Sequence, residues 1–362
     1  MNQCLKEESA LKTVVEIDGV DFLINGRKTY EGDTDGRRRI EGLLLNSRMI
    51  QAIFDDECPE TRNAWRYPDA NVWDPDRNTD EFCAMLPTYR TYGLLAVTVG
   101  MQGGGSIYTR PFYDQYLNSA FRPDGSLKSE YMKRLLRVIE AADSAGIVTI
   151  INYFYWRQER FHDEAAVKRA TEEATQWLLA TRFCNIIVDV KNEVREAEGI
   201  LSSRGIDALI EIVRSTALGQ RRLLVGTSTL PKKHLPEGKW IDLVDLFLPH
   251  GNDIFPDAWR SSLRQIKASD PLLKRPRPIC CNEDSIDLRN LEVSLDEGCS
   301  WGYYDQGFGC DQKQTKMDWT TRPREGRYED LSGFQTVPVN WSVNTDHKRA
   351  FFQRLREVTG GK

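Results

Sequence analysis

The chain has 362 residues, of which 40% are hydrophobic and 28% charged, and its formal net charge is −5. This composition is typical of a globular protein, and the interspersed charges argue against nucleic acid as a partner because phosphate contacts need clustered Lys and Arg. No apolar run approaches the roughly 18–20 residues that cross a bilayer, so we expect no membrane partner. The N-terminus lacks the apolar core of a secretory signal, which predicts a cytoplasmic protein.

Cysteine and histidine patterns give little support to a metal centre. The eight cysteines form no C-x-x-C pair, and the four histidines form neither H-x-H nor H-E-x-x-H. Buried, reduced thiols are therefore the expected state of the cysteines. We expect no metal and no organic cofactor.

The first recognisable elements are short strands in an N-terminal segment, residues 1–31. Asp18-Gly19 and Asn25-Gly26 are hairpin turn signals between short apolar runs. No Pro/Gly/Ser linker divides the rest of the chain, so we expect a single domain over residues 1–362.

Eight short apolar runs then alternate with amphipathic segments. The runs do not alternate apolar with polar residues, which is typical of parallel strands covered on both faces. The predicted strands span residues 40–47, 93–100, 146–153, 185–192, 222–228, 243–250, 277–283 and 298–305. The predicted helices span residues 79–93, 126–146, 162–181, 205–219, 257–269, 287–298 and 344–359.

This alternation predicts the fold class. Eight strand and helix units match an α/β (β/α)₈ TIM barrel with an N-terminal β-hairpin and long βα loops. An open, doubly wound sheet is the alternative, but it seldom needs eight sequential units.

Two predicted strands end in an Asn-Glu pair. The run NIIVDVKNE ends in Asn192-Glu193, and strand seven ends in Asn282-Glu283. Barrel chemistry takes place at the C-terminal ends of strands, and strands four and seven face each other across the mouth. Two carboxylates about 5–5.5 Å apart are suited to retaining glycoside hydrolysis, whereas about 6.5–9.5 Å leaves room for a water and gives inversion.

These residues resemble the clan A glycoside hydrolases, of which family five is the familiar example. The resemblance implies that Glu193 is the general acid/base and Glu283 the nucleophile, and that Asn192 binds the sugar 2-hydroxyl. It also implies sugar-site positions for His250, at the end of strand six, and for Trp301 in strand eight. On this reading the pKa of Glu193 is expected to be raised by the charge of Glu283.

Three positions depart from the pattern of that clan. Val194 follows Glu193 where Pro is frequent, and Asn252 stands where an H-x-Y motif has tyrosine after His250. Strand two also lacks the arginine often found at its end. The sequence therefore leaves open which residue orients the nucleophile.

Aromatic and amide side chains near the strand ends complete the candidate site. Aromatic rings can cover the apolar faces of sugars, so Trp156 and Trp301 are predicted sugar platforms, with Tyr153 beside them. Gln102, in the glycine-rich segment after strand two, is a predicted hydrogen-bonding residue.

We therefore expect a retaining hydrolase that cleaves a β-type glycosidic bond in small glycosides or oligosaccharides. A carbohydrate-binding barrel without turnover remains an alternative, as does a barrel enzyme of different chemistry, such as a lyase or a metal-dependent hydrolase. Three cations near the predicted mouth, Arg157, Lys191 and Arg195, leave a charged sugar open as a substrate.

Overall fold

The computed structural model describes residues 12–36, 38–104, 114–196, 199–231, 238–307 and 327–361. Parts of the predicted N-terminal segment and of the predicted long loops (residues 1–11, 105–113 and 308–326) lie outside this description. No helix in the described part is long and apolar enough to span a membrane.

The predicted barrel is confirmed by the pairing of its strands. One parallel sheet has the order β10-β9-β8-β7-β6-β13, and β11 pairs in parallel with β12. Parallel bridges from Phe247 to Ile279 and from Cys280 to Ser300 connect the sixth, seventh and eighth strands. The ring thus closes from β13 onto β6. The barrel strands are β6 (Asn46–Arg48), β7 (Ala96–Gly100), β8 (Val148–Phe154), β9 (Ile186–Lys191), β10 (Leu224–Gly226), β11 (Ser228–Thr229), β12 (Leu248–Pro249) and β13 (Gly302–Tyr303).

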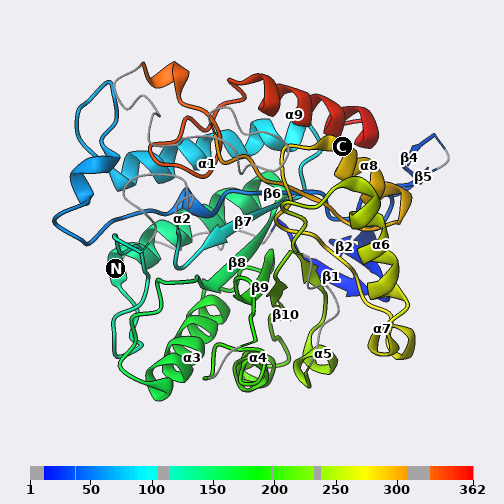
Figure 1. Cartoon of the computed structure of the whole chain (residues 1–362), viewed down its shortest axis with the longest axis horizontal. Helices are drawn as coiled ribbons and strands as arrows, with labels where there is room; N and C mark the ends of the chain where they lie inside the picture. The colour runs from blue at the N-terminus through cyan, green and yellow to red at the C-terminus, as the bar shows by residue number, and fades with distance from the viewer. Residues whose placement is uncertain are drawn as a thin grey trace, which may run out of the picture.

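Helices surround these strands, as Figure 1 shows. Apolar side chains from the helices and from the outer faces of the strands form one continuous core. The helices are α1 (Pro75–Thr91), α2 (Ser129–Ala145), α3 (Glu164–Ala180), α4 (Ile206–Ser215), α5 (Trp240–Leu243), α6 (Pro256–Lys267), α7 (Asp270–Lys274), α8 (Leu288–Asp296) and α9 (Asp346–Thr359). Short 3₁₀ turns span Ile50–Ala52, Arg62–Trp65 and Tyr328–Asp330.

The N-terminal hairpin packs against the opposite end of the barrel from the strand C-termini. β1 (Val15–Asp18) pairs with β2 (Asp21–Ile24), which continues to β3 (Arg27–Lys28). A bridge from Val14 to Cys184 attaches the hairpin at the start of β9. A second hairpin, β4 (Thr34–Asp35) with β5 (Arg38–Arg39), was not predicted.

Helix boundaries differ from the predictions where a capping signal was misread. The first helix was predicted to begin at residue 79, but it begins at Pro75, because the carboxylate of Asp74 caps it by accepting the amides of Asp76 and Arg77. The predicted stop at Gly146 is correct, and this residue has the left-handed conformation (φ 73°) that favours glycine.

Candidate active site

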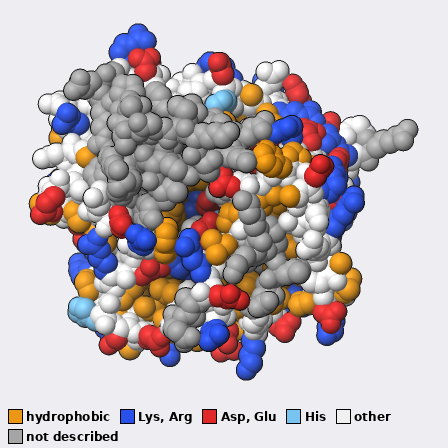
Figure 2. Space-filling view, viewed as in Figure 1, with side chains coloured by type: hydrophobic (Ala, Val, Ile, Leu, Met, Phe, Trp, Pro, Cys, Tyr) orange, Lys and Arg blue, Asp and Glu red, His pale blue; other side chains and the backbone are white. Residues whose placement is uncertain are grey.

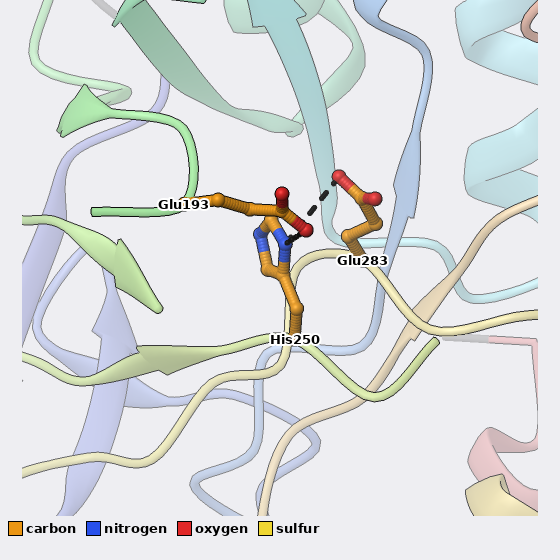
Figure 3. Close-up of side chains that lie close together, drawn as sticks. All are labelled: Glu193, His250 and Glu283. Atoms are coloured by element: carbon orange, nitrogen blue, oxygen red, sulfur yellow. Dashed lines mark hydrogen bonds and ion pairs between the residues drawn. The ribbon is translucent and has the colours of Figure 1, made fainter. Parts of the chain in front are cut away.

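Three titratable side chains from three strand ends meet at the mouth of the barrel. Glu193 follows β9, His250 follows β12, and Glu283 follows the segment bridged at Ile279 and Cys280. One ligand atom from each residue lies within 4.8 Å of those of the other two. Figure 3 shows the imidazole of His250 beside both carboxylates. Figure 2, in the orientation of Figure 1, shows acidic and basic side chains together near the centre of this face.

The backbone turns sharply at Glu193. This residue has φ 53°, a left-handed conformation that is uncommon for a non-glycine residue. The turn is held by Ser228, whose hydroxyl accepts the Glu193 amide at 3.1 Å and whose carbonyl accepts the Val194 amide at 2.9 Å. The turn therefore ends the strand and positions the Glu193 carboxylate beside His250.

Glu283 is buried between two donors. Arg48 Nε lies 2.7 Å from Glu283 Oε2, and Asn252 Nδ2 donates to Oε1 at 2.6 Å. The Glu283 side chain is only 7% exposed. Asn252 occupies the position where the H-x-Y motif has tyrosine, so an amide here contacts the predicted nucleophile.

Arg48 links the carboxylate to the neighbouring amide. It belongs to β6, is completely buried, and donates from Nη2 to Asn192 Oδ1 at 2.8 Å. Its guanidinium also lies 5.9 Å from the ring of Tyr155 and 5.7 Å from that of Tyr304. Burial lowers the pKa of Arg48, but Glu283 together with Tyr155, Tyr304 and Asp189 raises it above its usual value, so the guanidinium stays charged.

The electrostatics of Glu193 differ from the sequence-based expectation. Burial raises the pKa of Glu193, but His250, at 3.3 Å from Oε1, and Arg195, at 3.2 Å from Oε2, lower it below its usual value. Burial lowers the pKa of His250, whereas Glu283 and Glu193 raise it above its usual value. The expected raised pKa of Glu193 is therefore not found, and the proton shared by this pair is held mainly by the imidazole.

Two further charged residues, both in β9, lie near Glu193 and His250. Asp189 is completely buried, accepts the Ser228 amide at 3.0 Å, and has a pKa raised by burial. Lys191 forms an ion pair with Glu159, and burial lowers the pKa of Lys191. Both residues are held by protein contacts.

Glu193, His250 and Glu283 together could offer ligands to a divalent cation. Both oxygens of Glu283 are already engaged, however, Oε1 by the hydrogen bond from Asn252 and Oε2 by the ion pair with Arg48. A cation bound to Glu283 would also lie beside the Arg48 guanidinium, and like charges repel. This donor set therefore suits a positioned carboxylate better than a metal ligand.

Two predicted binding residues lie close to these groups. The ring of Trp156 lies 4.0 Å from the guanidinium carbon of Arg195, which pairs with Glu193. Gln102 is buried, accepts the Tyr155 amide at 3.0 Å, and donates to the Gln158 carbonyl at 2.9 Å. Trp156 is thus placed to contact a ligand, whereas Gln102 holds the segment that carries Tyr155.

Two other predicted binding residues face the core. Tyr153 is completely buried, and its hydroxyl lies 3.2 Å from that of Thr175 in α3. Trp301 is also completely buried, and its ring packs 6.1 Å from Phe351 of α9. Since neither side chain has an exposed face, we do not retain them as sugar-binding candidates.

Four side chains that contact this site were not among the predicted site residues: Arg48, Asn252, Tyr155 and Tyr304. Arg48 directly follows a run predicted to end at residue 47, so one more residue of strand would have included it. Asn252 was noted only as a departure from tyrosine. Tyr155 needs the glycine at 104, because a Cβ there would lie 2.2 Å from the Tyr155 ring.

Comparison with known proteins supports the architecture. No family model and no curated protein matches this sequence. A glycoside hydrolase family 5 structure from Bacteroides vulgatus matches with a TM-score of 0.53 at 15% identity, covering 88% of this chain and 68% of the other. A broad-specificity GH5-4 endoglucanase from an uncultured bovine rumen ciliate matches with a TM-score of 0.51 at 12% identity, covering 88% and 96%.

Another Bacteroides vulgatus structure, whose glycoside hydrolase activity is itself a proposal, gives a TM-score of 0.51 at 12% identity. This chain spans 57% of the length of that protein. At such low identities the similarity concerns the fold. The chain therefore shares the fold of clan A, family-five-like glycoside hydrolase barrels, as the resemblance of its strand ends implied.

Proposed function

We propose that the protein is a retaining glycoside hydrolase that cleaves a β-type bond by double displacement. Glu283 attacks the anomeric carbon while Glu193 protonates the leaving oxygen. Glu193 then removes a proton from water, which releases the sugar from Glu283. The observation that carries the proposal is the approach of the two carboxylates at the barrel mouth.

The separation of the carboxylates favours retention over inversion. An oxygen of Glu193 and an oxygen of Glu283 lie within 4.8 Å of each other. Retaining enzymes have separations of about 5–5.5 Å, and inverting enzymes need about 6.5–9.5 Å to admit a water between the carboxylate and the sugar.

The contacts of the two carboxylates support different roles. Arg48 and Asn252 stabilise an ionised Glu283, which is the form that attacks. The hydrogen bond between His250 and Glu193 keeps a proton available to Glu193. When Glu283 forms the covalent intermediate, its negative charge is lost, which lowers the pKa of Glu193 and keeps this residue ionised, the form that takes a proton from the attacking water.

The charges at the mouth favour a neutral sugar. The three cations that left a charged substrate open each pair with a carboxylate: Arg157 with Asp114, Lys191 with Glu159, and Arg195 with Glu193. Arg48 holds the Asn192 carbonyl oxygen, so the amide nitrogen of Asn192 can donate to a sugar hydroxyl. We propose small neutral glycosides or oligosaccharides as substrates.

Azide rescue tests both the mechanism and the two assignments. A panel of 2,4-dinitrophenyl β-glycosides would be incubated with the wild-type protein, and the first-formed anomer followed by NMR. We expect retention. With azide, Glu283→Ala should give the glycosyl azide of inverted configuration, and Glu193→Ala the one of retained configuration. An inverted wild-type product would contradict the double displacement, and exchanged azide products would exchange the two roles.

The remaining alternatives have separate outcomes in the same assay. A binding barrel would bind the sugars by calorimetry without releasing dinitrophenol. A metal-dependent hydrolase would lose activity in EDTA and regain it with added divalent cation, whereas we expect EDTA to leave turnover unchanged.

A further inference from the structure

A second cavity lies at the other end of the barrel. It has a volume of about 330 Å³, within the range of small-ligand pockets. Its lining comes from the β1–β2 turn, the amino ends of the first, seventh and eighth strands, and α7, which Figure 1 shows beside α6. The last residue of α6, Lys267, also lines the cavity and pairs with Glu297. Most of the lining is apolar: Val20, Leu43, Leu272, Leu273, Pro276 and Ile279.

Two apolar residues of this lining are exposed to solvent. Leu273 is 66% exposed and Val20 is 51% exposed, and they are among the few large hydrophobic side chains of the described residues that are so accessible. Leu273 is in α7, and Val20 is in the β1–β2 turn. The cavity is therefore open to solvent past apolar side chains that the fold itself does not bury.

A guanidinium without a carboxylate partner lines the same cavity. Arg277 is only 5% exposed, and no carboxylate of the described residues lies within ion-pair distance of it. Its guanidinium donates hydrogen bonds to the backbone carbonyls of Ile241, Val244, Pro271 and Arg275. These bonds use four of the five guanidinium N–H groups, which leaves one on Nη2 for a further acceptor.

The charges around Arg277 are mixed: Arg275 and Arg214 oppose its charge, whereas Asp242 and Asp245 favour it from beyond ion-pair distance. Burial and, after it, neighbouring Arg275 lower the pKa of Arg277 to about 10, and at neutral pH the guanidinium remains charged. Asp245, one of the nearest acidic residues, already pairs with Arg214 and Arg222. A buried cation without a counter-ion is costly, and an anion that neutralises it would be stabilised.

We propose that this cavity, which we call the Arg277 cavity, binds a small amphipathic carboxylate. The carboxylate pairs with Arg277, and the apolar body lies against Leu43, Leu272 and Ile279. Arg277 lies just before the strand that ends in Glu283, so this site is at the end of the barrel opposite the predicted catalytic pair. The proposal does not depend on the protein being a glycosidase.

Octanoate is the probe for this site, and binding to the full-length protein is measured by calorimetry. We expect one octanoate per chain, and at least tenfold weaker binding of octanol, which has the same apolar body without the charge. Leu273→Asp places a negative charge at the exposed rim and should weaken octanoate binding at least tenfold. Leu218→Asp is the matched control, because Leu218 is similarly exposed (52%) on another part of the surface.

Arg277→Gln keeps hydrogen-bond donors but removes the charge, and it should abolish the preference for octanoate over octanol. Because Arg277 also binds backbone carbonyls, the unfolding temperature of the Arg277→Gln protein is measured in parallel. If Arg277→Gln unfolds, Leu273→Asp still decides the test. Equal binding of octanoate and octanol to the wild-type protein would overturn the proposal. So would equal effects of Leu273→Asp and Leu218→Asp, or loss of octanoate binding in Glu283→Gln, which would place the probe in the catalytic mouth.

Discussion

The two carboxylates of the barrel mouth lie close together but are held by different chemistry. Glu283 is bound by a buried arginine and an amide, Arg48 and Asn252, which both favour its ionised form. Glu193 is bound by His250 and by the partly exposed Arg195, and its side chain is twice as exposed, 15% against 7%. The surroundings of Glu283 keep its negative charge fixed, whereas the surroundings of Glu193 keep a proton exchangeable between this residue and His250.

This difference shows how one fold can give two identical side chains different tasks. A nucleophile needs a stable negative charge, and a cation beside it supplies that stabilisation. A general acid and base must gain and lose a proton in each turnover, so a titratable partner suits it better than a permanent charge. Each of the following changes removes one part of this difference.

The largest effect is expected from the loss of the arginine on the Glu283 side. Arg48→Met should lower kcat about 10²–10³-fold, as for removal of a group that stabilises charge at a reacting centre. It should also cost roughly 3–5 kcal/mol of folding stability, because Glu283 is left buried without its partner. Steady-state kinetics and urea unfolding measure the two effects. Unchanged kcat in a folded Arg48→Met protein would remove Arg48 from the mechanism.

A smaller loss is expected from the amide on the same side. Asn252→Ala removes one hydrogen bond to a charged group, worth about 1.5–3 kcal/mol, and should lower kcat/KM about 10–100-fold. Asn252→Asp puts a like charge beside Glu283 and should lower kcat/KM further than Asn252→Ala, because repulsion disfavours the ionised carboxylate that attacks. Equal kcat/KM of Asn252→Asp and the wild-type protein would show that Asn252 only packs.

On the Glu193 side, the change should be mainly in pH dependence. His250→Asn removes the group that most strongly lowers the pKa of Glu193, so that pKa should rise. Because the acid must be protonated, the alkaline limb of the kcat/KM profile should move to higher pH. Arg195→Gln should move it in the same direction by less, because Arg195 is more exposed. A shift to lower pH would contradict this assignment.

The smallest effect is expected from the aromatic neighbour of Arg195. Trp156→Ala should raise KM a few-fold and leave kcat nearly unchanged, because the ring packs against Arg195, the partner of Glu193, and would bind the sugar through its apolar face. Trp177→Ala is the matched control, since Trp177 is also half-buried but lies in α3. Equal changes in KM for both variants would argue against a binding role for Trp156.

The sequence predicted the fold well because its main signal, short apolar runs alternating with amphipathic helices, is the one that a barrel requires. It also directed attention to Glu193 and Glu283, since a carboxylate at the end of an apolar run is unusual. Their approach and the contact of His250 with Glu193 followed from the strand order of the barrel. The placement of Glu193, His250 and Glu283 depends on the order of the strands, and the alternation of apolar runs with amphipathic helices encodes that order.

The remaining contacts depend on which way each side chain points. All seven residues of β8 are buried, so the pattern of burial cannot distinguish Tyr153, which points to α3, from its neighbours that point inward. The same ambiguity applies to Trp301, which packs on α9. Arg48 was missed for a different reason: the arginine was sought at the end of strand two, whereas strand one supplies it.

The ion pair of Arg48 and Glu283 also affects how the protein folds. Arg48 belongs to the first barrel strand, and Glu283 follows the seventh, so most of the chain lies between the two partners. Until the seventh strand has docked, a folded first half would have to bury a guanidinium without its counter-ion. We expect this to make partly formed barrels unstable, so that the two ends of the ring fold cooperatively rather than one after the other.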